Sequence, residues 1–420
     1  MAKRTTKPES GSHASVNDAP AGRVERAGRS GSVHGSVHTK VAELIEAMEQ
    51  IAPIHLAEPW DNVGLLLGSP DEHLHGPVLL CIDLTHDVLD EARALGSTTI
   101  IAYHPPIFHA FKQLTSRDPG QALILRAARA GVSLYSPHTA LDAAPGGLCD
   151  WLADCALGTL TKTKAGTSHA DRRALSPSAH QPESQQFKVV TFVPHGDLDT
   201  VRQALATAGA GRIGNYEVCS FACEGDGTFY GNEHSSPAIG PGGRLETSKE
   251  ARLEMVCSKR SLALAIATLK QFHPYEEPAV DVYPLAPTML REIGVGRRLV
   301  LDKPASLQDI AARIKGALGV AHVELAVATD KPISCIGVCP GAGAALMDAA
   351  MAENCELFLT GEMKHHDILA AVRRGMSVML AGHTRTERPY LRTLATRLKI
   401  LLPEAKFEVS CEDRDPLVTV

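Results

Sequence analysis

The stretch VLLCIDLTHDVLDEARALGSTTIIAYH, residues 78–104, decides the fold class of this chain. It begins with a nearly continuous apolar run, continues with an amphipathic segment that ends at Gly96, and closes with a second apolar run. Such runs are typical of strands buried on both faces, and helical spacing of apolar positions is typical of a helix that covers a sheet. The stretch therefore predicts a β-α-β unit within a parallel sheet that is covered by helices.

The same alternation of apolar runs and amphipathic segments recurs along the chain. The further apolar runs are 132–138, 333–339, 356–361 and 377–383. They fall into two groups in which apolar runs and amphipathic segments alternate in the same way, one before residue 162 and one after residue 291. We therefore predict two related α/β/α halves, 38–162 and 291–420, that arose by duplication and together form one site.

A segment of different order separates the two halves. Residues 163–186 lack periodicity and are expected to form a linker. Residues 187–290 then follow the order β-α-β-β-α-β, which is typical of a ferredoxin-like insert, with a long Gly/Pro-rich loop at 224–243. The first 37 residues are rich in Ser, Gly and Ala and predict a disordered tail.

Composition excludes several classes of protein. A chain of 420 residues is too long for one core, and its net charge of −6 argues against a general nucleic-acid binder, although it permits a small anionic substrate. No apolar run reaches the roughly 18 residues of a membrane span, and no secretory signal is evident. The ten cysteines are scattered without the spacing of a structural zinc site, which indicates a reducing compartment and predicts a cytoplasmic location.

Imidazole and carboxylate groups follow the ends of four predicted strands. These residues are Tyr103 and His104, His138 and Asp142, Glu362 and His366, and His383 and Glu387. Active groups of α/β sheets gather where strands end, and these side chains are the usual ligands of zinc, iron, manganese and cobalt. Their repetition at equivalent points of two similar halves favours a divalent-metal site built by His104, Asp142, His383 and Glu387.

Each of these residues also has a purely structural interpretation. Asp142 could cap a helix that starts near Gly147, and Glu387 could be a favourable charge at a helix N-terminus. In WDNVG, residues 60–64, Trp60 could form a substrate wall, or Asp61 and Asn62 could merely form an Asx turn. The glycines of GAGAA, residues 341–345, suit either an anion or close packing of a helix on a strand.

Taken together, these segments resemble the family of GTP cyclohydrolase 1 type 2 homologues, also called Nif-three-like proteins. The matching segments are EPWDNVGLLLG at 58–68, AYHPPIF at 102–108, HTALDAAPGG at 138–147, IGVCPGAGAALM at 336–347, TGEMKHHD at 360–367 and GHTRTE at 382–387. The resemblance covers residues 38 to about 415. HPYEEPAVDVYPL, residues 273–285, is similar to the end of the insert in the longer members.

The resemblance implies two divalent metal ions per subunit, either Zn, Fe, Mn or Co. It places His104 and Asp142 on one ion and His383 on the other, with Glu387 bridging them. Many members have a histidine where this chain has Tyr103, and neutral tyrosine is a poor ligand because its proton leaves near pH 10. The second ion is therefore expected to bind weakly, to take a water, or to recruit His138 or His366.

The resemblance also implies an assembly and an activity. It implies a toroidal homohexamer with a PII-like insert, and a dinuclear metal-dependent hydrolase, in which His138 or His366 relays protons. Trp60, Asp61, Asn62 and Glu362 are the expected substrate contacts. The alternative is a ring-forming regulatory, scaffold or metallochaperone protein that binds metal without catalysis.

Overall fold

The computed structural model describes residues 39–159 and 171–417. The tail predicted over 1–37 and the linker residues 163–170 lie outside these ranges. Eleven α-helices and four sheets are present in the described part of the chain, which confirms the predicted α/β class. None of these helices combines the length and the apolar character that crossing a membrane requires.

The first large sheet has the strand order β1-β4-β3-β2-β17. Its strands are β1 (Gly64–Leu67), β2 (Val78–Cys81), β3 (Thr99–Ala102), β4 (Ser133–Ser136) and β17 (Phe407–Val409). β1 is antiparallel to β4, and the other pairs are parallel. Helices α2 (His86–Ala94) and α3 (Pro119–Arg129) cover one face of this sheet, where Val88 and Ile124 pack on Leu79 and Ile100.

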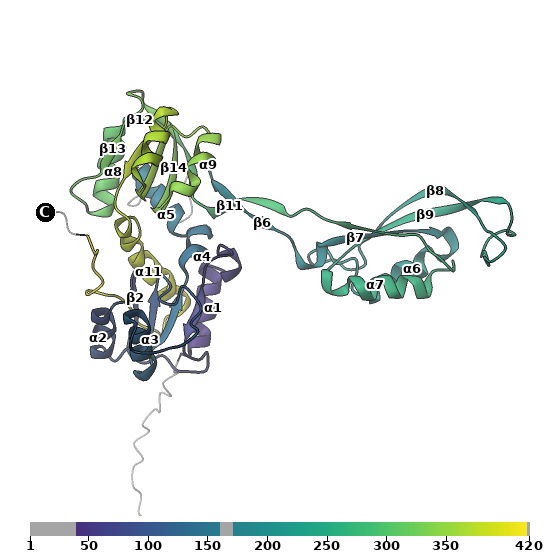
Figure 1. Cartoon of the computed structure of the whole chain (residues 1–420), viewed down its shortest axis with the longest axis horizontal. Helices are drawn as coiled ribbons and strands as arrows, with labels where there is room; N and C mark the ends of the chain where they lie inside the picture. The colour runs from purple at the N-terminus through teal and green to yellow at the C-terminus, as the bar shows by residue number, and fades with distance from the viewer. Residues whose placement is uncertain (1–38, 160–170, 418–420) are drawn as a thin grey trace, which may run out of the picture. The chain divides into compact units, whose positions relative to one another are not determined.

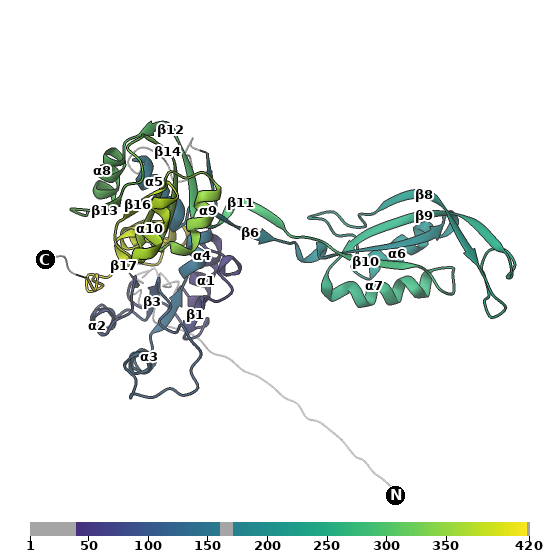
Figure 2. The ribbon, with the colours of Figure 1, turned by 45° about the horizontal axis from the view of Figure 1, so that its top comes forward.

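The second large sheet has the order β13-β16-β15-β14-β12-β5. Its strands are β5 (Arg172–Arg173), β12 (Arg297–Ala305), β13 (Glu324–Ala326), β14 (Ile333–Ala342), β15 (Leu357–Glu362) and β16 (Ser377–Leu380). Strands β14, β15 and β16 are parallel, and β13 is antiparallel to β16. Helices α9 (Met347–Ala352) and α10 (His365–Arg373) pack on one face, as Figure 2 shows.

The two sheets share a core pattern and exchange elements. In each, an antiparallel edge strand is followed by three parallel strands, in the orders β1-β4-β3-β2 and β13-β16-β15-β14. Helix α5 (Leu148–Leu157) packs on β12, β14 and α8 (Leu307–Leu318) of the second half. Helix α11 (Leu391–Leu401) packs in return on β2, β17 and α1 (Val41–Ile51) of the first half (Figure 1). One hydrophobic core therefore includes Leu80 and Ile101 together with Ile336 and Leu359.

The insert forms a sheet of its own, in the order β10-β7-β9-β8. Its elements are β7 (Phe187–Pro194), α6 (Leu198–Thr207), β8 (Phe221–Tyr230), β9 (Leu245–Cys257), α7 (Lys259–Phe272) and β10 (Val280–Pro284). Both helices pack on one face of this sheet, through Val201, Leu205 and Leu269 (Figure 1). Strand β8 extends to Tyr230, so the loop expected over 224–243 is shorter than its glycines suggested.

The irregular linker expected over 163–186 is wrong for residues 172–180. Arg172–Arg173 form β5, which pairs with β12, and Ser176–His180 form β6, which pairs with β11 (Thr288–Val295). Both partner strands follow more than 100 residues later in the chain. The pairing therefore depends on distant backbone groups, and a local search for periodicity could not detect it.

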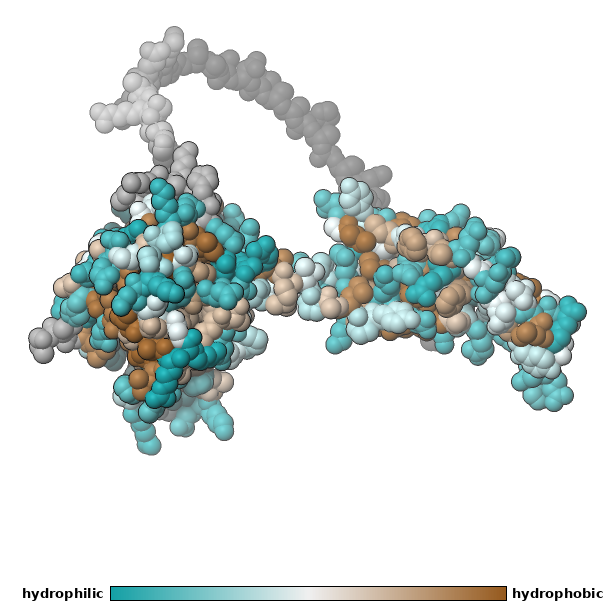
Figure 3. Space-filling model, turned by 90° about the horizontal axis from the view of Figure 1, so that it is seen from above, coloured by the Kyte–Doolittle hydropathy of each residue, from teal (hydrophilic) through white to brown (hydrophobic). Residues whose placement is uncertain are grey.

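Apolar side chains remain exposed at several places. On the face drawn in Figure 3, brown apolar residues are interspersed with teal polar residues. Among the large exposed side chains are Trp60 and Phe108 in the first half, and Phe221 and Tyr230 in the insert. Single exposed apolar residues are ordinary, so only those that lie beside chemically active groups are considered further.

Candidate metal centre

Three side chains from the two halves meet at the carboxyl ends of their strands. His104 follows β3 and His383 follows β16, while Glu387 lies between the 3-10 turns Thr384–Thr386 and Arg388–Tyr390. One ligand atom of each lies within 4.8 Å of the others. Nε2 of His104 is 3.6 Å from one Glu387 carboxylate oxygen, and Nε2 of His383 is 3.5 Å from the other. The two imidazoles thus converge on one carboxylate.

A second carboxylate orients each of these imidazoles. His104 Nδ1 donates to Asp83 Oδ1 at 2.9 Å, and His383 Nδ1 lies 3.1 Å from Glu362 Oε1. A carboxylate on the far nitrogen is the usual support of a metal-binding histidine, because it fixes the ring and leaves the other nitrogen free to coordinate. The arrangement therefore presents both Nε2 atoms as ligands.

Glu387 supplies the sharpest indication that a cation belongs here. Its side chain is only 3% exposed, and its Oε2 accepts no hydrogen bond within the described part of the chain. A buried carboxylate oxygen without a partner is costly unless a cation compensates it. A Cβ at Gly341, where φ is +60°, would lie 2.6 Å from Glu387 Oε1, so glycine keeps this space open. The group of His104, His383 and Glu387 can therefore hold a metal ion.

The protonation of His104 reflects the surrounding negative charge. Burial alone would lower its pKa, but the hydrogen bond to Asp83 and the nearby negative charge of Glu387 raise the pKa to about 10. Burial likewise would raise the pKa of Asp83, and the hydrogen bond from His104 lowers it instead. A metal-binding histidine must be neutral, so an ion at this position would replace the proton that the carboxylates otherwise hold on His104.

Asp142, the fourth predicted ligand, lies outside this group of three. It sits within α4 (His138–Ala143), so the alternative that it caps a later helix is wrong, because Gly147 is the N-cap of α5. Its Oδ1 accepts the Tyr103 hydroxyl at 2.7 Å. Burial raises the pKa of Asp142 to about 6, although the bond from Tyr103 opposes that rise. Burial and Asp142 also raise the pKa of Tyr103, which therefore acts here as a hydrogen-bond donor.

His138 stands beside the group and is held by Asp61. Its Nδ1 donates to Asp61 Oδ1 at 2.8 Å, and its ring centroid lies 5.4 Å from that of His104. Burial would raise the pKa of Asp61, but hydrogen bonds from His138 and Thr139 lower it. His138 has φ +25°, and such values in non-glycine residues cluster at functional sites because the surrounding structure must enforce them.

The predicted substrate wall lies on the same side as His138. The Trp60 ring is 6.0 Å from that of Phe108 and 6.1 Å from that of His138, and Trp60 is 59% exposed. Asn62 donates its backbone N–H to Asp61 Oδ1, but an Asx turn would need the N–H two residues on, and the backbone hydrogen bond from Asp61 N to Glu58 O places the turn at 58–61 instead. Residues 58–61 thus combine a local turn with a wall next to the imidazoles.

Two other predicted residues, Glu362 and His366, are not among the group of three. Glu362 lies beside His383 Nδ1, and its predicted contact with a substrate stays a prediction. His366 is exposed in the first turn of α10, and its ring neighbour is His365. No contact between His366 and the group of three is present within the described residues. Close packing also explains Gly343 of the glycine-rich stretch, since a Cβ there would lie 2.5 Å from Thr360 Oγ1.

Sequence reasoning missed the residues that support His104. Asp83 follows β2 directly, so the rule that found the other strand ends could have found it too. Asp413 accepts the backbone N–H of Ile82 at 2.7 Å and that of Asp83 at 3.4 Å, and it forms an ion pair with Arg388. It thereby joins the end of β2 to the turn that follows Glu387. Nothing in the local pattern around Asp413 signals this role.

Comparison with known proteins gives consistent matches over nearly the whole chain. Residues 39–416 match the family described as Duf34/NIF3 (NGG1p interacting factor 3). A protein of Halalkalibacterium halodurans named GTP cyclohydrolase 1 type 2 homolog is 32% identical, over 87% of this chain and 94% of its own length. The Bos taurus NIF3-like protein 1 is 33% identical, over 89% of this chain and 91% of its own length.

Solved structures show the same fold. A Bacillus cereus protein related to NIF3 is 29% identical with a TM-score of 0.60, covering 92% of this chain and all of that chain. A Staphylococcus aureus protein is 26% identical with a TM-score of 0.70, covering 91% of this chain and 99% of that chain.

Proposed function

This chain belongs to the Duf34/NIF3 family, and on that premise we propose that it is a hydrolase dependent on a dinuclear divalent-metal site. One observation carries the proposal: the Nε2 atoms of His104 and His383, from different halves, converge on the buried carboxylate of Glu387. Three acidic or imidazole ligands with an open side suit a catalytic ion better than a closed structural site.

In this proposal, His104 and Asp142 hold one ion, His383 holds the other, and Glu387 bridges them. Tyr103 supports Asp142 through its hydroxyl but does not itself ligate, so the second position has one imidazole fewer than it would with histidine there. A Tyr103→His variant tests this reading. Metal per chain should rise in the variant, whereas an unchanged metal content would show that Tyr103 does not limit the second position.

Divalent ions at this site would act as Lewis acids toward a substrate oxygen and would acidify water. The chain's own groups complete the arrangement. His138, whose Nδ1 is engaged by Asp61, can accept or donate a proton at Nε2. Trp60 and Phe108 offer exposed rings on which a planar part of the substrate can lie. Asp83 and Glu362 keep the two ligating rings oriented.

The name of the Halalkalibacterium halodurans relative makes GTP the first substrate to test, within a panel of nucleotides and phosphodiesters. The shared strand order of the two sheets supports an origin of the halves by duplication. The element order of the insert is compatible with a PII-like domain. We also propose a homohexamer, which light scattering of the purified protein would test.

The experiment compares metal content and turnover in the wild type, His104→Ala and Glu387→Ala, with the exposed His322→Ala as a matched control. The proposal expects both variants to lose metal and turnover together, while the control keeps both. Turnover that persists after the metal is lost would show that the activity belongs to a contaminant. Bound metal without turnover on any substrate would favour the ring-forming regulatory, scaffold or metallochaperone role instead.

A further inference from the structure

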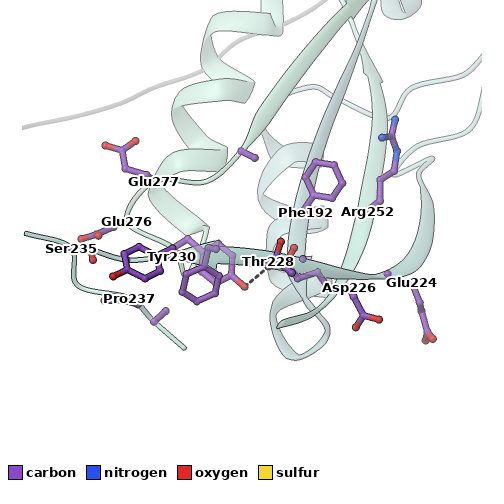
Figure 4. A pocket seen from close by; sticks show the side chains of 18 of the residues that line it. Phe192, Glu224, Asp226, Thr228, Tyr230, Ser235, Pro237, Arg252, Glu276 and Glu277 are labelled. Atoms are coloured by element: carbon purple, nitrogen blue, oxygen red, sulfur yellow. Dashed lines mark hydrogen bonds between the residues drawn. The ribbon is translucent and has the colours of Figure 1, made fainter. Parts of the chain in front are cut away.

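A cavity of about 780 Å³ lies in the insert, and none of its lining residues belongs to the candidate metal centre. Strand register shows which side chains face it. Phe192 of β7 and Cys223 of β8 both pair with Arg252 of β9, so all three lie on one face of the sheet. Helices α6 and α7 cover the opposite face, through Val189 and Leu253. The cavity therefore opens on the uncovered face, as Figure 4 shows from close by.

Aromatic rings form much of this cavity. Phe192, Phe229, Tyr230 and Tyr275 all line it, and the rings of Phe229 and Tyr275 lie 6.5 Å apart. The face of an aromatic ring attracts cations. This wall already holds one cation in that way, because the Arg252 guanidinium carbon lies 5.8 Å from the centre of the Phe192 ring.

Glu250 places a nearly buried carboxylate on the same surface. It is only 7% exposed, and its Oε1 accepts the Tyr275 hydroxyl at 2.6 Å. Its Oε2 accepts no hydrogen bond from any residue that the structure describes, yet Glu250 lines the cavity. A Cβ at Gly227 would clash with that Oε2, so glycine on β8 leaves room for it. The residue is mostly buried while this oxygen stays accessible from the cavity, so it would attract a cation placed there.

The remaining charges have the same sign. Glu276 and Glu277 also line the cavity, and Glu276 accepts the backbone N–H of Ser236 at 2.9 Å. Arg252 is the only arginine or lysine among the lining residues, and its Nε already donates to Glu254 at 2.8 Å. Glu224 and Asp226 line the cavity as well, and Asp226 is paired with Lys249.

We propose that this cavity binds a small organic cation, an ammonium or guanidinium group carried on an apolar body. The proposal rests on the aromatic rings of the cavity, on the Glu250 oxygen that has no hydrogen-bond partner among the described residues, and on the excess of carboxylates over basic groups in the lining. An anion would meet five lining carboxylates and a single arginine there. A bare divalent ion needs about six oxygen ligands, and within the described residues no trio of His, Cys, Asp or Glu ligand atoms gathers at the cavity. Rings combined with few carboxylates suit an organic cation.

The test is calorimetric titration of the full-length protein with choline and with ethylguanidinium, each as its chloride salt. Dimethylbutanol, the neutral carbon analogue of choline, is the matched ligand control. We expect at least one of the two cations to bind, and the neutral analogue to bind about tenfold more weakly or not at all. Glu250→Gln should weaken binding by a similar factor, while Asp199→Asn, on helix α6 over the opposite face of the sheet, should leave it unchanged.

A second variant, Gly227→Ala, keeps Glu250 but displaces its carboxylate, and it should also weaken binding. Thermal unfolding of each variant shows whether the insert remains folded, and Tyr275→Phe provides a milder change if Glu250→Gln does not fold. The proposal is overturned if neither cation binds, if dimethylbutanol binds as well as choline, or if Glu250→Gln has no effect. It is also overturned if a second copy occupies the cavity, in which case these variants would change the mass in solution without any cation binding.

Discussion

The two halves carry nearly the same motif at equivalent strand ends and use it differently. After β4 the chain reads HTALD, residues 138–142, and after β16 it reads HTRTE, residues 383–387. Each motif has a histidine followed four residues later by a carboxylate. In the second half, Glu387 faces two imidazoles and has a buried oxygen without a hydrogen-bond partner among the described residues. In the first half, Asp142 is engaged by Tyr103, and His138 is engaged by Asp61.

This difference shows that strand order alone does not define a metal ligand. Both residues are buried, but of the two only Glu387 has a fully buried oxygen without a hydrogen-bond partner among the described residues. The first half supplies its imidazole from β3 instead, through His104. In the group of three, His383 and Glu387 therefore come from the second half and His104 from the first, while His138 lies beside them.

The strongest test of this difference between the halves is to neutralise Glu387 and Asp142 in separate variants. Glu387→Gln removes the charge on which both imidazoles converge, so we expect metal affinity to fall by about 100-fold or more. Asp142→Asn should have a smaller effect, because Tyr103 already satisfies one of its oxygens. Metal content after dialysis against a graded chelator measures both. Equal losses in the two variants would mean that the halves ligate equivalently.

A second prediction concerns the link that holds the halves together. Arg297 of β12 is fully buried, and its Nε donates to Asp150 Oδ1 of α5 at 2.7 Å. Arg297→Met removes the more buried of the two arginines that pair with Asp150 and leaves only Arg172, so it should lower the free energy of unfolding by about 3 kcal/mol. Urea unfolding at pH 7 measures this change, and Arg298→Met, on the same strand but partly exposed, is the control.

The pH dependence of that link has a definite sign. Burial would raise the pKa of Asp150, but Arg297, with a smaller contribution from Arg172, lowers it instead. A carboxylate with a depressed pKa stabilises the fold above its unfolded value of about 3.9, and this contribution disappears as the pH falls through the folded pKa. The difference in stability between wild type and Arg297→Met should therefore shrink below about pH 4. A difference that stays constant down to pH 3 would contradict the ion pair as its source.

Most of the fold, and the meeting of His104, His383 and Glu387 at the strand ends, could be predicted from the sequence, for physical reasons. Apolar periodicity reports burial, so β2, β3, β14 and β15 were evident, and strand ends located His104, His383 and Glu387. The packing of α5 on the second large sheet and of α11 on the first was not evident, because both helices have ordinary amphipathic patterns. Such a pattern shows that a helix has a buried face, but not which sheet it packs on. Asp413 was also missed, since its role depends on a strand end some 330 residues earlier. Local patterns cannot encode such pairings.

A third prediction compares the carboxylates that orient the two ligating rings. Asp83→Asn and Glu362→Gln should each weaken metal binding by about 10- to 100-fold, because these groups fix the ring and raise its basicity. Asp83 should have the larger effect, since it is less exposed and its backbone is tied to Asp413. Competition with a fluorescent chelator measures both affinities. If Asp61→Asn, which acts on His138, weakens binding equally, His138 is itself a ligand.

The smallest predicted effect tests an asymmetry around the site. Trp60 precedes β1 in the first half, whereas the residues before β13 in the second half, 319–323, contain no aromatic side chain. Any stacking of a planar substrate should therefore depend on the first half alone. Because only one face of the Trp60 ring is available for stacking, Trp60→Leu should weaken substrate binding by about 1 kcal/mol. This corresponds to roughly a fivefold rise in KM, with kcat little changed.

Fluorescence can detect this stacking without turnover. The chain has two tryptophans, of which Trp60 is 59% exposed and Trp151 only 8%, so a nucleotide that stacks beside the site should quench Trp60 selectively. Trp60→Phe keeps a ring for stacking but removes the signal, so its affinity should remain close to that of the wild type while the quenching disappears. Quenching that survives in Trp60→Phe would place the nucleotide near Trp151 instead, and the exposed rings of the first half would then have no part in binding.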